Sequence, residues 1–209
     1  PLAAIRLAGQ SLQRLMEPSE GVNKRLENID RAVQNIDHVL ERSRDMDRFE
    51  QSARSKHRQT TDLHTLVLGW VDGSGQAQRV RAQMPPSTCA VQVDVMVLNL
   101  MVNNLLDNAL KYSPEDALVD LTVTLSTLDD KPALHTPALL IRVSNLVGRA
   151  GRPDPARLFS KYYRADAAQF ISGTGLGLSW VQGVAQQAQG LVRYLPAEEH
   201  IVFELVMPC

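Results

Sequence analysis

The chain has 209 residues, of which 44% are hydrophobic and 22% charged, a composition typical of folded domains and not of disordered chains. Its 22 lysine and arginine residues against 23 aspartate and glutamate residues give a formal net charge of −1, which excludes nucleic-acid binding through bulk charge. No run of about 18 apolar residues is present to span a membrane, and Cys89 and Cys209 alone cannot form a disulfide framework, so we expect no membrane contact and a reducing compartment.

Residues 1–60 are predicted to form a helical hairpin. Within residues 22–58, read as one long helix, apolar residues recur at alternating spacings of four and three, as in a coiled-coil seam: Val22, Leu26, Ile29, Val33, Ile36 and Leu40. A shorter apolar stripe precedes this helix and ends at a Pro/Gly turn, residues 17–21. Because two helices cannot enclose a core, we expect half of a dimeric four-helix bundle. The alternative is that the seam packs within the chain.

A second domain, residues 61–209, is predicted from short β-branched runs with a period of two. Strands are expected at 78–82, 89–93, 119–126, 139–144, 191–195 and 201–206, the last two as neighbours, and helices at 63–71, 94–112 and 174–189. Since no regular βαβ repeat appears, the predicted fold class is α+β, a two-layer sandwich. The long segment from Asn145 to Gly173 has the length of a functional lid or a disordered loop.

The predicted helix 94–112 carries polar residues along one face. Asn104, Asn108 and Lys111 follow one another at spacings of four and three. Amide oxygens can coordinate Mg²⁺, and amide and ammonium N–H groups can bind phosphate. A solvated helix face is the alternative interpretation. Asparagine is a poor helix former, so its repeated use in mid-helix calls for a reason.

A glycine-rich motif, residues 173–178 (GTGLGL), precedes the last predicted helix. Glycines allow the backbone to approach a ligand closely, and the N–H groups at a helix start bind phosphate oxygens. The motif lacks the Gly-Lys-Ser/Thr of a Walker loop and the preceding strand of a dinucleotide fingerprint. A glycine turn that packs a helix against a sheet is the alternative interpretation.

Taken together, these segments resemble the catalytic half of bacterial two-component sensor histidine kinases, whose ATP-binding domain has the Bergerat fold of gyrase-type ATPases. Residues 104–113 (NLLDNALKYS) resemble the family's N box, residues 159–164 (FSKYYR) its F box, and residues 173–178 its second glycine box. The resemblance implies an ATP-dependent protein-histidine kinase with ATP and Mg²⁺ as ligands. It implies that Asn104 and Asn108 are catalytic and hold Mg²⁺, and that the ATP-binding residues are these two with Lys111, Tyr112, Asn145, Lys161, Arg164, Gly173, Thr174, Gly175, Leu176 and Gly177.

The first residues resemble the end of the family's H box. This resemblance implies that the phosphoacceptor histidine lies just upstream of Pro1, so that the chain holds no phosphoacceptor histidine and does not phosphorylate itself. It further implies a homodimer through the hairpin, a response-regulator receiver domain as partner, and a cytoplasmic position as the intracellular part of an inner-membrane sensor. No nucleic-acid partner is expected.

The first glycine box departs from the family pattern Asp-x-Gly-x-Gly. Asn145 stands for the aspartate, and Val147 and Arg149 stand for the glycines, although Gly148 and Gly151 could compensate. An uncharged acceptor for the adenine amino group is weaker by about 1 kcal/mol, which predicts roughly tenfold weaker ATP binding. The altered box therefore motivates the alternative of a degenerate ATP-binding scaffold or a phosphatase-dominant module. A gyrase-type or chaperone-type ATPase, which shares the nucleotide fold, is a further alternative.

A helix cap is predicted within the lid. Asp154 followed by Pro155 is typical of a helix start, which would place Phe159 and Arg164 on a short helix.

Overall fold

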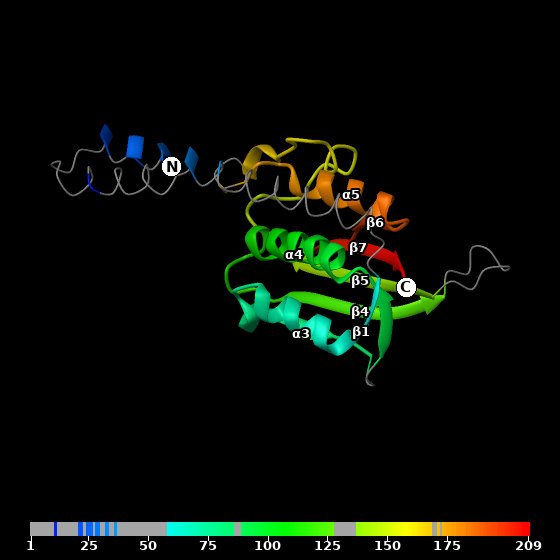
Figure 1. Cartoon of the computed structure of the whole chain (residues 1–209). Coiled ribbons are helices and arrows are strands. Elements are labelled where there is room, and N and C mark those ends of the chain that lie inside the picture. The colour runs from blue at the N-terminus through cyan, green and yellow to red at the C-terminus, as the bar shows by residue number, and fades with distance from the viewer. Residues whose placement is uncertain are drawn as a thin grey trace. The chain divides into compact units, whose positions relative to one another are not determined.

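The computed structural model describes residues 11, 21, 22, 24–26, 28, 29, 32, 33, 36, 58–85, 89–127, 137–168, 171 and 173–209. Figure 1 draws the described helices and strands. The chain divides into two compact units, residues 1–48 with 171–174 and residues 49–170 with 175–209, and each is described by itself. No helix among the described residues is long and apolar enough to cross a membrane.

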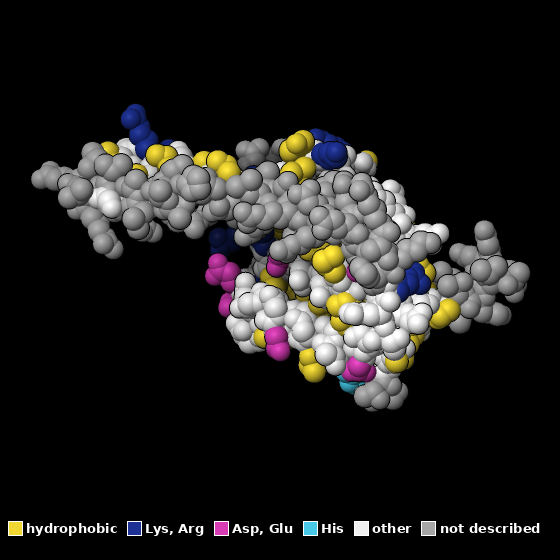
Figure 2. All heavy atoms as spheres, viewed as in Figure 1, with side chains coloured by type: hydrophobic (Ala, Val, Ile, Leu, Met, Phe, Trp, Pro, Cys, Tyr) yellow, Lys and Arg dark blue, Asp and Glu magenta, His cyan; other side chains and the backbone are white. Residues whose placement is uncertain are grey.

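The first unit is helical at every described position between residues 21 and 36, as the apolar periodicity predicts. Ile29 and Ile36 of the predicted seam are 46% and 48% exposed, and Figure 2 shows hydrophobic side chains at the surface of this unit. Val33 is buried. The rest of the predicted hairpin, including most of its first helix, the turn before Gly21 and the seam beyond Ile36, lies outside the described residues.

A five-stranded mixed sheet forms one layer of the second unit. Its strands, in the order β2-β4-β5-β7-β6, are β2 (Val80–Gln83), β4 (Val119–Thr127), β5 (Pro137–Leu146), β7 (His200–Pro208) and β6 (Leu191–Pro196). β2 is parallel to β4, and the other neighbouring pairs are antiparallel. A separate antiparallel pair joins β1 (Gln59–Asp62) to β3 (Ala90–Val93).

Helices form the second layer, on one face of the sheet: α3 (Leu63–Gly73), α4 (Val95–Tyr112) and α5 (Gly177–Gln187) (Figure 1). The side chains of Asp62 and Asp94 accept hydrogen bonds, both at 3.1 Å, from the backbone N–H groups three residues further on. Each aspartate satisfies a donor that a helix start leaves unpaired, which explains where α3 and α4 begin. Short 3₁₀ helices, η1 (Ala77–Arg79) and η2 (Asp166–Ala168), complete the unit.

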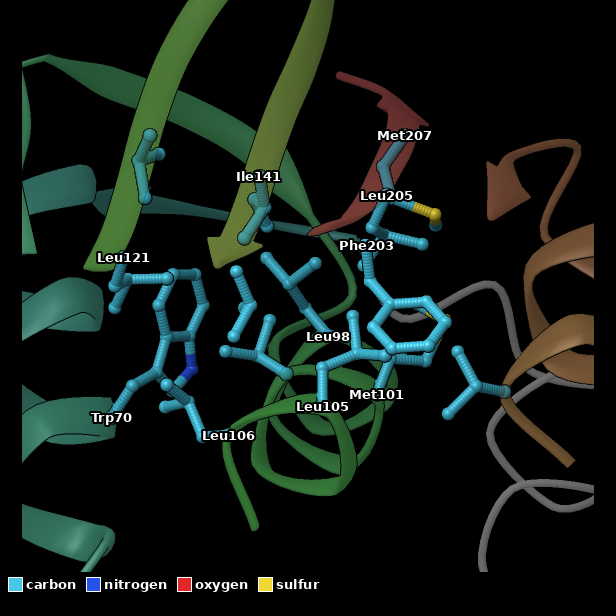
Figure 3. Packing of buried hydrophobic residues seen from close by; sticks show 14 of the residues in the cluster. Trp70, Leu98, Met101, Leu105, Leu106, Leu121, Ile141, Phe203, Leu205 and Met207 are labelled. Carbon is cyan, nitrogen blue, oxygen red and sulfur yellow. The ribbon is translucent and has the colours of Figure 1, made fainter. Parts of the chain in front are cut away.

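The hydrophobic core of this unit lies between α4 and the sheet. In Figure 3 the side chains of the sheet point toward those of α4: Leu121, Ile141, Phe203, Leu205 and Met207 toward Leu98, Met101, Leu105 and Leu106. Trp70 of α3 joins the same core, and its indole Nε1–H donates to the amide oxygen of Asn99 at 2.7 Å. Because these contacts hold α4 by its apolar side, Asn104, Asn108 and Lys111 lie on its less buried side.

The predicted α+β sandwich is confirmed, including the pairing of β6 with β7. Strand β1 was not predicted, because its sequence QTTD has no apolar alternation and it exists through pairing with β3. Helix α5 begins at Gly177 and not at Thr174.

The short helix predicted after Asp154 is wrong. Residues 155–159 form turns, in which the Asp154 carboxylate accepts a hydrogen bond from the N–H of Ala156 at 2.9 Å, and Arg164 lies beyond them. The aspartate therefore caps a turn that does not continue as a helix.

Candidate functional site

The polar side of α4 carries an amide oxygen without a hydrogen-bond partner among the described residues. The Asn104 amide nitrogen donates to the carbonyl oxygen of Leu100 at 3.1 Å, which fixes the side chain against its own helix. Its oxygen is buried and unsatisfied. A buried acceptor without a donor is costly, so this oxygen suits a cation or a ligand donor. Asn108, one turn later, is half-buried.

The last turn of α4 gathers positive charge around an aromatic ring. The ammonium nitrogen of Lys111 lies 5.5 Å from the centroid of the Tyr112 ring. Burial raises the pKa of the Tyr112 hydroxyl, and the positive charge of Arg164 acts on the same group in the opposite direction. The end of the N box and the last residue of the F box thus lie within electrostatic reach of each other. Arg164 donates to the Ala168 carbonyl at 2.5 Å.

Asn145 lies near the end of β5, opposite Val119 and Ile201, and its side chain is almost fully buried at 1% exposure. Its amide nitrogen donates to the carbonyl oxygen of Leu146 at 2.7 Å. With the nitrogen engaged in this way, the amide oxygen is the group that the side chain presents as an acceptor.

The chain that leaves β5 packs against the end of α4. A Cβ atom on Gly148 would lie 2.2 Å from the carbonyl oxygen of Tyr112, so only glycine fits there. Gly151 adopts φ +69° and donates its N–H to the Gly148 carbonyl at 3.0 Å. Glycines are therefore needed in this segment, but at 148 and 151 and not at the family positions held by Val147 and Arg149.

The segment after Gly151 is anchored to the core through its F box. Leu158 is buried, and the Phe159 ring meets the Phe203 ring of β7 edge-on, with centroids 6.4 Å apart. The Tyr163 hydroxyl accepts a hydrogen bond from the Asp154 N–H at 2.8 Å. Lys161 is exposed.

The second glycine box packs on the F box at Gly175. This glycine has φ +70°, and a Cβ atom on it would lie 2.7 Å from the Tyr162 carbonyl carbon and 2.8 Å from the Tyr163 carbonyl oxygen. The Tyr162 N–H donates to the Gly175 carbonyl at 2.9 Å. Tyr162 itself has φ +65° and a side chain that is 73% exposed. Residues of two motifs, 12 and 13 positions apart in the sequence, thus share one close backbone contact.

Helix α5 begins with a buried glycine, Gly177, and its N-cap residue, Leu176, makes no side-chain cap hydrogen bond. Backbone N–H groups at a helix start of this kind are the donors that bind phosphate oxygens in nucleotide sites. Gly173, with φ 153°, and Thr174 belong to the first unit, so their position relative to these residues is not described.

The structure thus brings some of the predicted site residues into contact with one another. It brings together Tyr112 with the Gly148 turn and Gly175 with Tyr162, and the charge of Arg164 acts on Tyr112. The role of Gly148 as a contact for α4 has no signal in the sequence beyond the presence of a glycine out of register.

Comparison with known proteins relates this arrangement to a family. Residues 93–208 match the family model described as "Histidine kinase-, DNA gyrase B-, and HSP90-like ATPase". The chain is 25% identical over 201 residues to the sensor histidine kinase HprS of Escherichia coli K12 (95% of this chain, 41% of that protein) and 28% identical over 196 residues to the sensor protein QseC of the same strain (89% and 39%). It thus spans about two fifths of the length of the curated relatives it matches.

Two solved structures share the fold. The histidine kinase AdeS of Acinetobacter baumannii superposes with a TM-score of 0.60 at 16% identity, covering 99% of this chain and 94% of that one. The mycobacterial sensor histidine kinase MprB superposes with a TM-score of 0.52 at 21% identity, covering 72% and 97%. The fold class predicted from the motifs is therefore confirmed.

Proposed function

Because the chain belongs to the histidine kinase-, DNA gyrase B- and HSP90-like ATPase family, we propose that it is the catalytic core of a two-component sensor histidine kinase. It binds ATP and passes the γ-phosphoryl group to a histidine, from which an aspartate of a response-regulator receiver domain takes it. The observation that carries the proposal is the match over residues 93–208, which includes all three motif segments. Relatives named as sensor kinases favour this activity over that of gyrase-type or chaperone-type ATPases.

Asn104 and Asn108 are the proposed catalytic residues and Mg²⁺ ligands. Amide oxygens are among the hard oxygen donors that divalent cations accept in proteins. The buried, unsatisfied oxygen of Asn104 supports this assignment. When bound, Mg²⁺ supplies neutralisation of phosphate charge. The positions of Asn104 and Asn108 on α4 would determine where the metal ion is held.

Phosphate oxygens are the proposed ligands of the basic and glycine-rich segments. Lys111, Tyr112, Lys161 and Arg164 provide positive charge and a hydroxyl donor, and residues 175–177 provide backbone N–H groups at the start of α5. Gly173 and Thr174 of the same motif are proposed as ATP contacts from the family resemblance alone. Phosphoryl transfer depends mainly on alignment and charge stabilisation, which these groups supply without a covalent step on the protein.

Asn145 is the proposed contact for the adenine amino group. Its amide oxygen is the acceptor that the hydrogen bond to Leu146 leaves available. An uncharged acceptor predicts weaker ATP binding than a carboxylate would give.

The first 60 residues are proposed to be the dimerisation hairpin and residues 61–209 the ATP-binding domain. The exposed Ile29 and Ile36 support a homodimer, because a helix buries its seam against a partner. His64 is already engaged, with its ring nitrogen Nε2 2.7 Å from the Pro85 carbonyl oxygen. We propose that the phosphoryl acceptor is a histidine outside the present chain, and that the protein works in the cytoplasm as part of an inner-membrane sensor.

Isothermal titration calorimetry with a non-hydrolysable ATP analogue and Mg²⁺ tests the nucleotide site. Saturable binding is expected, and Asn108→Ala should abolish or strongly weaken it. Gly183→Ala serves as the control, because a Cβ atom on Gly183 would have no atom within 4 Å. Absence of saturable heat at millimolar analogue would instead favour the scaffold alternative.

Phosphotransfer is tested on the full-length gene product. Incubation with ATP labelled at the γ-phosphate should give an acid-labile, base-stable phosphoprotein, as phosphohistidine does. The Asn108→Ala variant should lose the label. A normal labelling rate in that variant would overturn the proposed kinase mechanism.

A further inference from the structure

We propose that Arg79, which belongs to none of the nucleotide-binding motifs, is a positioning residue for the nucleotide site through the end of α4. The proposal rests on the proposed function, since it concerns the same site. Arg79 is the last residue of η1, directly before β2, and it is half-buried. Nothing in the sequence around it resembles a family motif.

The Arg79 guanidinium is enclosed by the end of α4 and the loop that follows. It donates to the Ser113 hydroxyl at 2.7 Å, the Pro114 carbonyl at 2.7 Å, the Ala117 carbonyl at 3.1 and 3.2 Å and the Leu110 carbonyl at 3.4 Å. The side-chain oxygen of Gln76, the residue before η1, accepts a further hydrogen bond from Arg79 at 2.9 Å. One side chain therefore joins the last turn of α4 to the loop that leads into β4.

The Gly148 turn contacts the same helix end. The Tyr112 carbonyl lies so close to Gly148 that no Cβ atom fits between them. The last turn of α4, which carries Lys111 and Tyr112, is thus contacted both by Arg79 and by the chain that leaves β5. Two such sets of contacts restrain the helix end against fraying, so the proposed phosphate-binding groups on its last turn keep their direction.

Arginine suits this place better than lysine for two reasons. The carbonyl groups at a helix C-terminus carry partial negative charge, which favours a cation. The planar fork of five N–H donors reaches several acceptors at once, whereas an ammonium group on a flexible stem reaches fewer in a fixed geometry. Arg79→Lys should therefore keep the charge and lose part of the positioning.

The test compares Arg79→Gln and Arg79→Lys with Arg81→Gln in the whole chain. Arg81 lies two residues away and donates two hydrogen bonds to Asp120 of β4, at 2.6 and 3.0 Å, instead of to α4. Its replacement by glutamine removes the same positive charge as Arg79→Gln. Affinity for the non-hydrolysable ATP analogue with Mg²⁺ is measured by calorimetry. Hydrogen exchange of the backbone amides of residues 110–118 is measured with and without nucleotide.

We expect Arg79→Gln to weaken analogue binding by about five- to tenfold, Arg79→Lys to fall between this variant and the wild type, and Arg81→Gln to stay within about twofold of the wild type. The 110–118 amides should exchange faster in the Arg79 variants, and saturating nucleotide should restore part of their protection. If Arg79→Gln does not fold, Arg79→Lys decides the question.

Unchanged affinity in a folded Arg79 variant, together with binding by the wild type, would overturn the positioning role and leave the proposed function intact. Equal weakening in Arg81→Gln would also overturn it, since the loss would then follow from charge alone. A wild type that does not bind the analogue would instead refute the proposed function, and this inference with it.

Discussion

Replacement of Gly148 by alanine should damage the fold and the nucleotide site together. The new Cβ atom would lie 2.2 Å from the Tyr112 carbonyl oxygen and 3.2 Å from the Ser113 carbonyl carbon, against 3.4–4 Å for an ordinary contact. Both neighbours are backbone atoms at the end of α4, so the clash is relieved only by separating α4 from the chain that leaves β5. Overpacking of this kind costs about 1–3 kcal/mol of unfolding free energy.

Gly183→Ala is the matched control for this change. Gly183 lies inside α5 with no atom within 4 Å of an added Cβ, so alanine should stabilise the protein by about 0.5–1 kcal/mol through helix propensity. The same chemical change is therefore expected to have opposite signs at two glycines.

Thermal unfolding and analogue binding measure the two effects. About 2–4 °C of melting temperature corresponds to each kcal/mol for a chain of this size. Gly148→Ala should melt at a lower temperature than the wild type and bind the ATP analogue more weakly, because Tyr112 and Lys111 move with the helix end. A Gly148→Ala protein with unchanged stability and unchanged affinity would refute the contact between Gly148 and Tyr112.

The remaining predictions concern three other features. Burial opposes ionisation of Glu204, but hydrogen bonds and charges from Arg142 and Arg193 outweigh it and lower the pKa of this carboxyl. The ionised carboxylate therefore stabilises the fold above the unfolded-state pKa of Glu204, and this stabilisation is lost as the pH falls through the lower pKa of the folded state. The melting temperature of the wild type should consequently drop more steeply below pH 4.5 than that of Glu204→Gln. Asn145→Asp should lower the melting temperature near neutral pH, because a carboxylate cannot donate to the Leu146 carbonyl. In calorimetry this variant should bind the analogue more tightly only if the charged contact to adenine contributes more free energy than the lost hydrogen bond to Leu146. Ile29→Arg with Ile36→Arg should shift the protein from dimer to monomer in sedimentation velocity, and an unchanged dimer would contradict the proposed seam.

Local pattern predicted most of the secondary structure of the second unit. Runs with a period of two became β4, β5 and β7, and the apolar face of residues 94–112 became the buried face of α4, because burial against one layer requires that periodicity. Strand β1 was not predicted, because the polar sequence QTTD forms a strand only through its pairing with β3. A helix was wrongly predicted after Asp154, because a capping residue satisfies the first N–H groups of a turn without ensuring that the turn continues as a helix.

The sequence by itself determined the order and identity of the motifs, and with them the family and the candidate site residues, since motif chemistry is carried by residue types at short spacings. Only the tertiary structure decided which of these segments touch. That Gly148 packs on Tyr112, that Gly175 packs on Tyr162, and that Arg79 joins α4 to the loop before β4 depend on contacts between residues 13 to 38 positions apart. Such contacts follow from the way the whole core packs, and no local pattern encodes them.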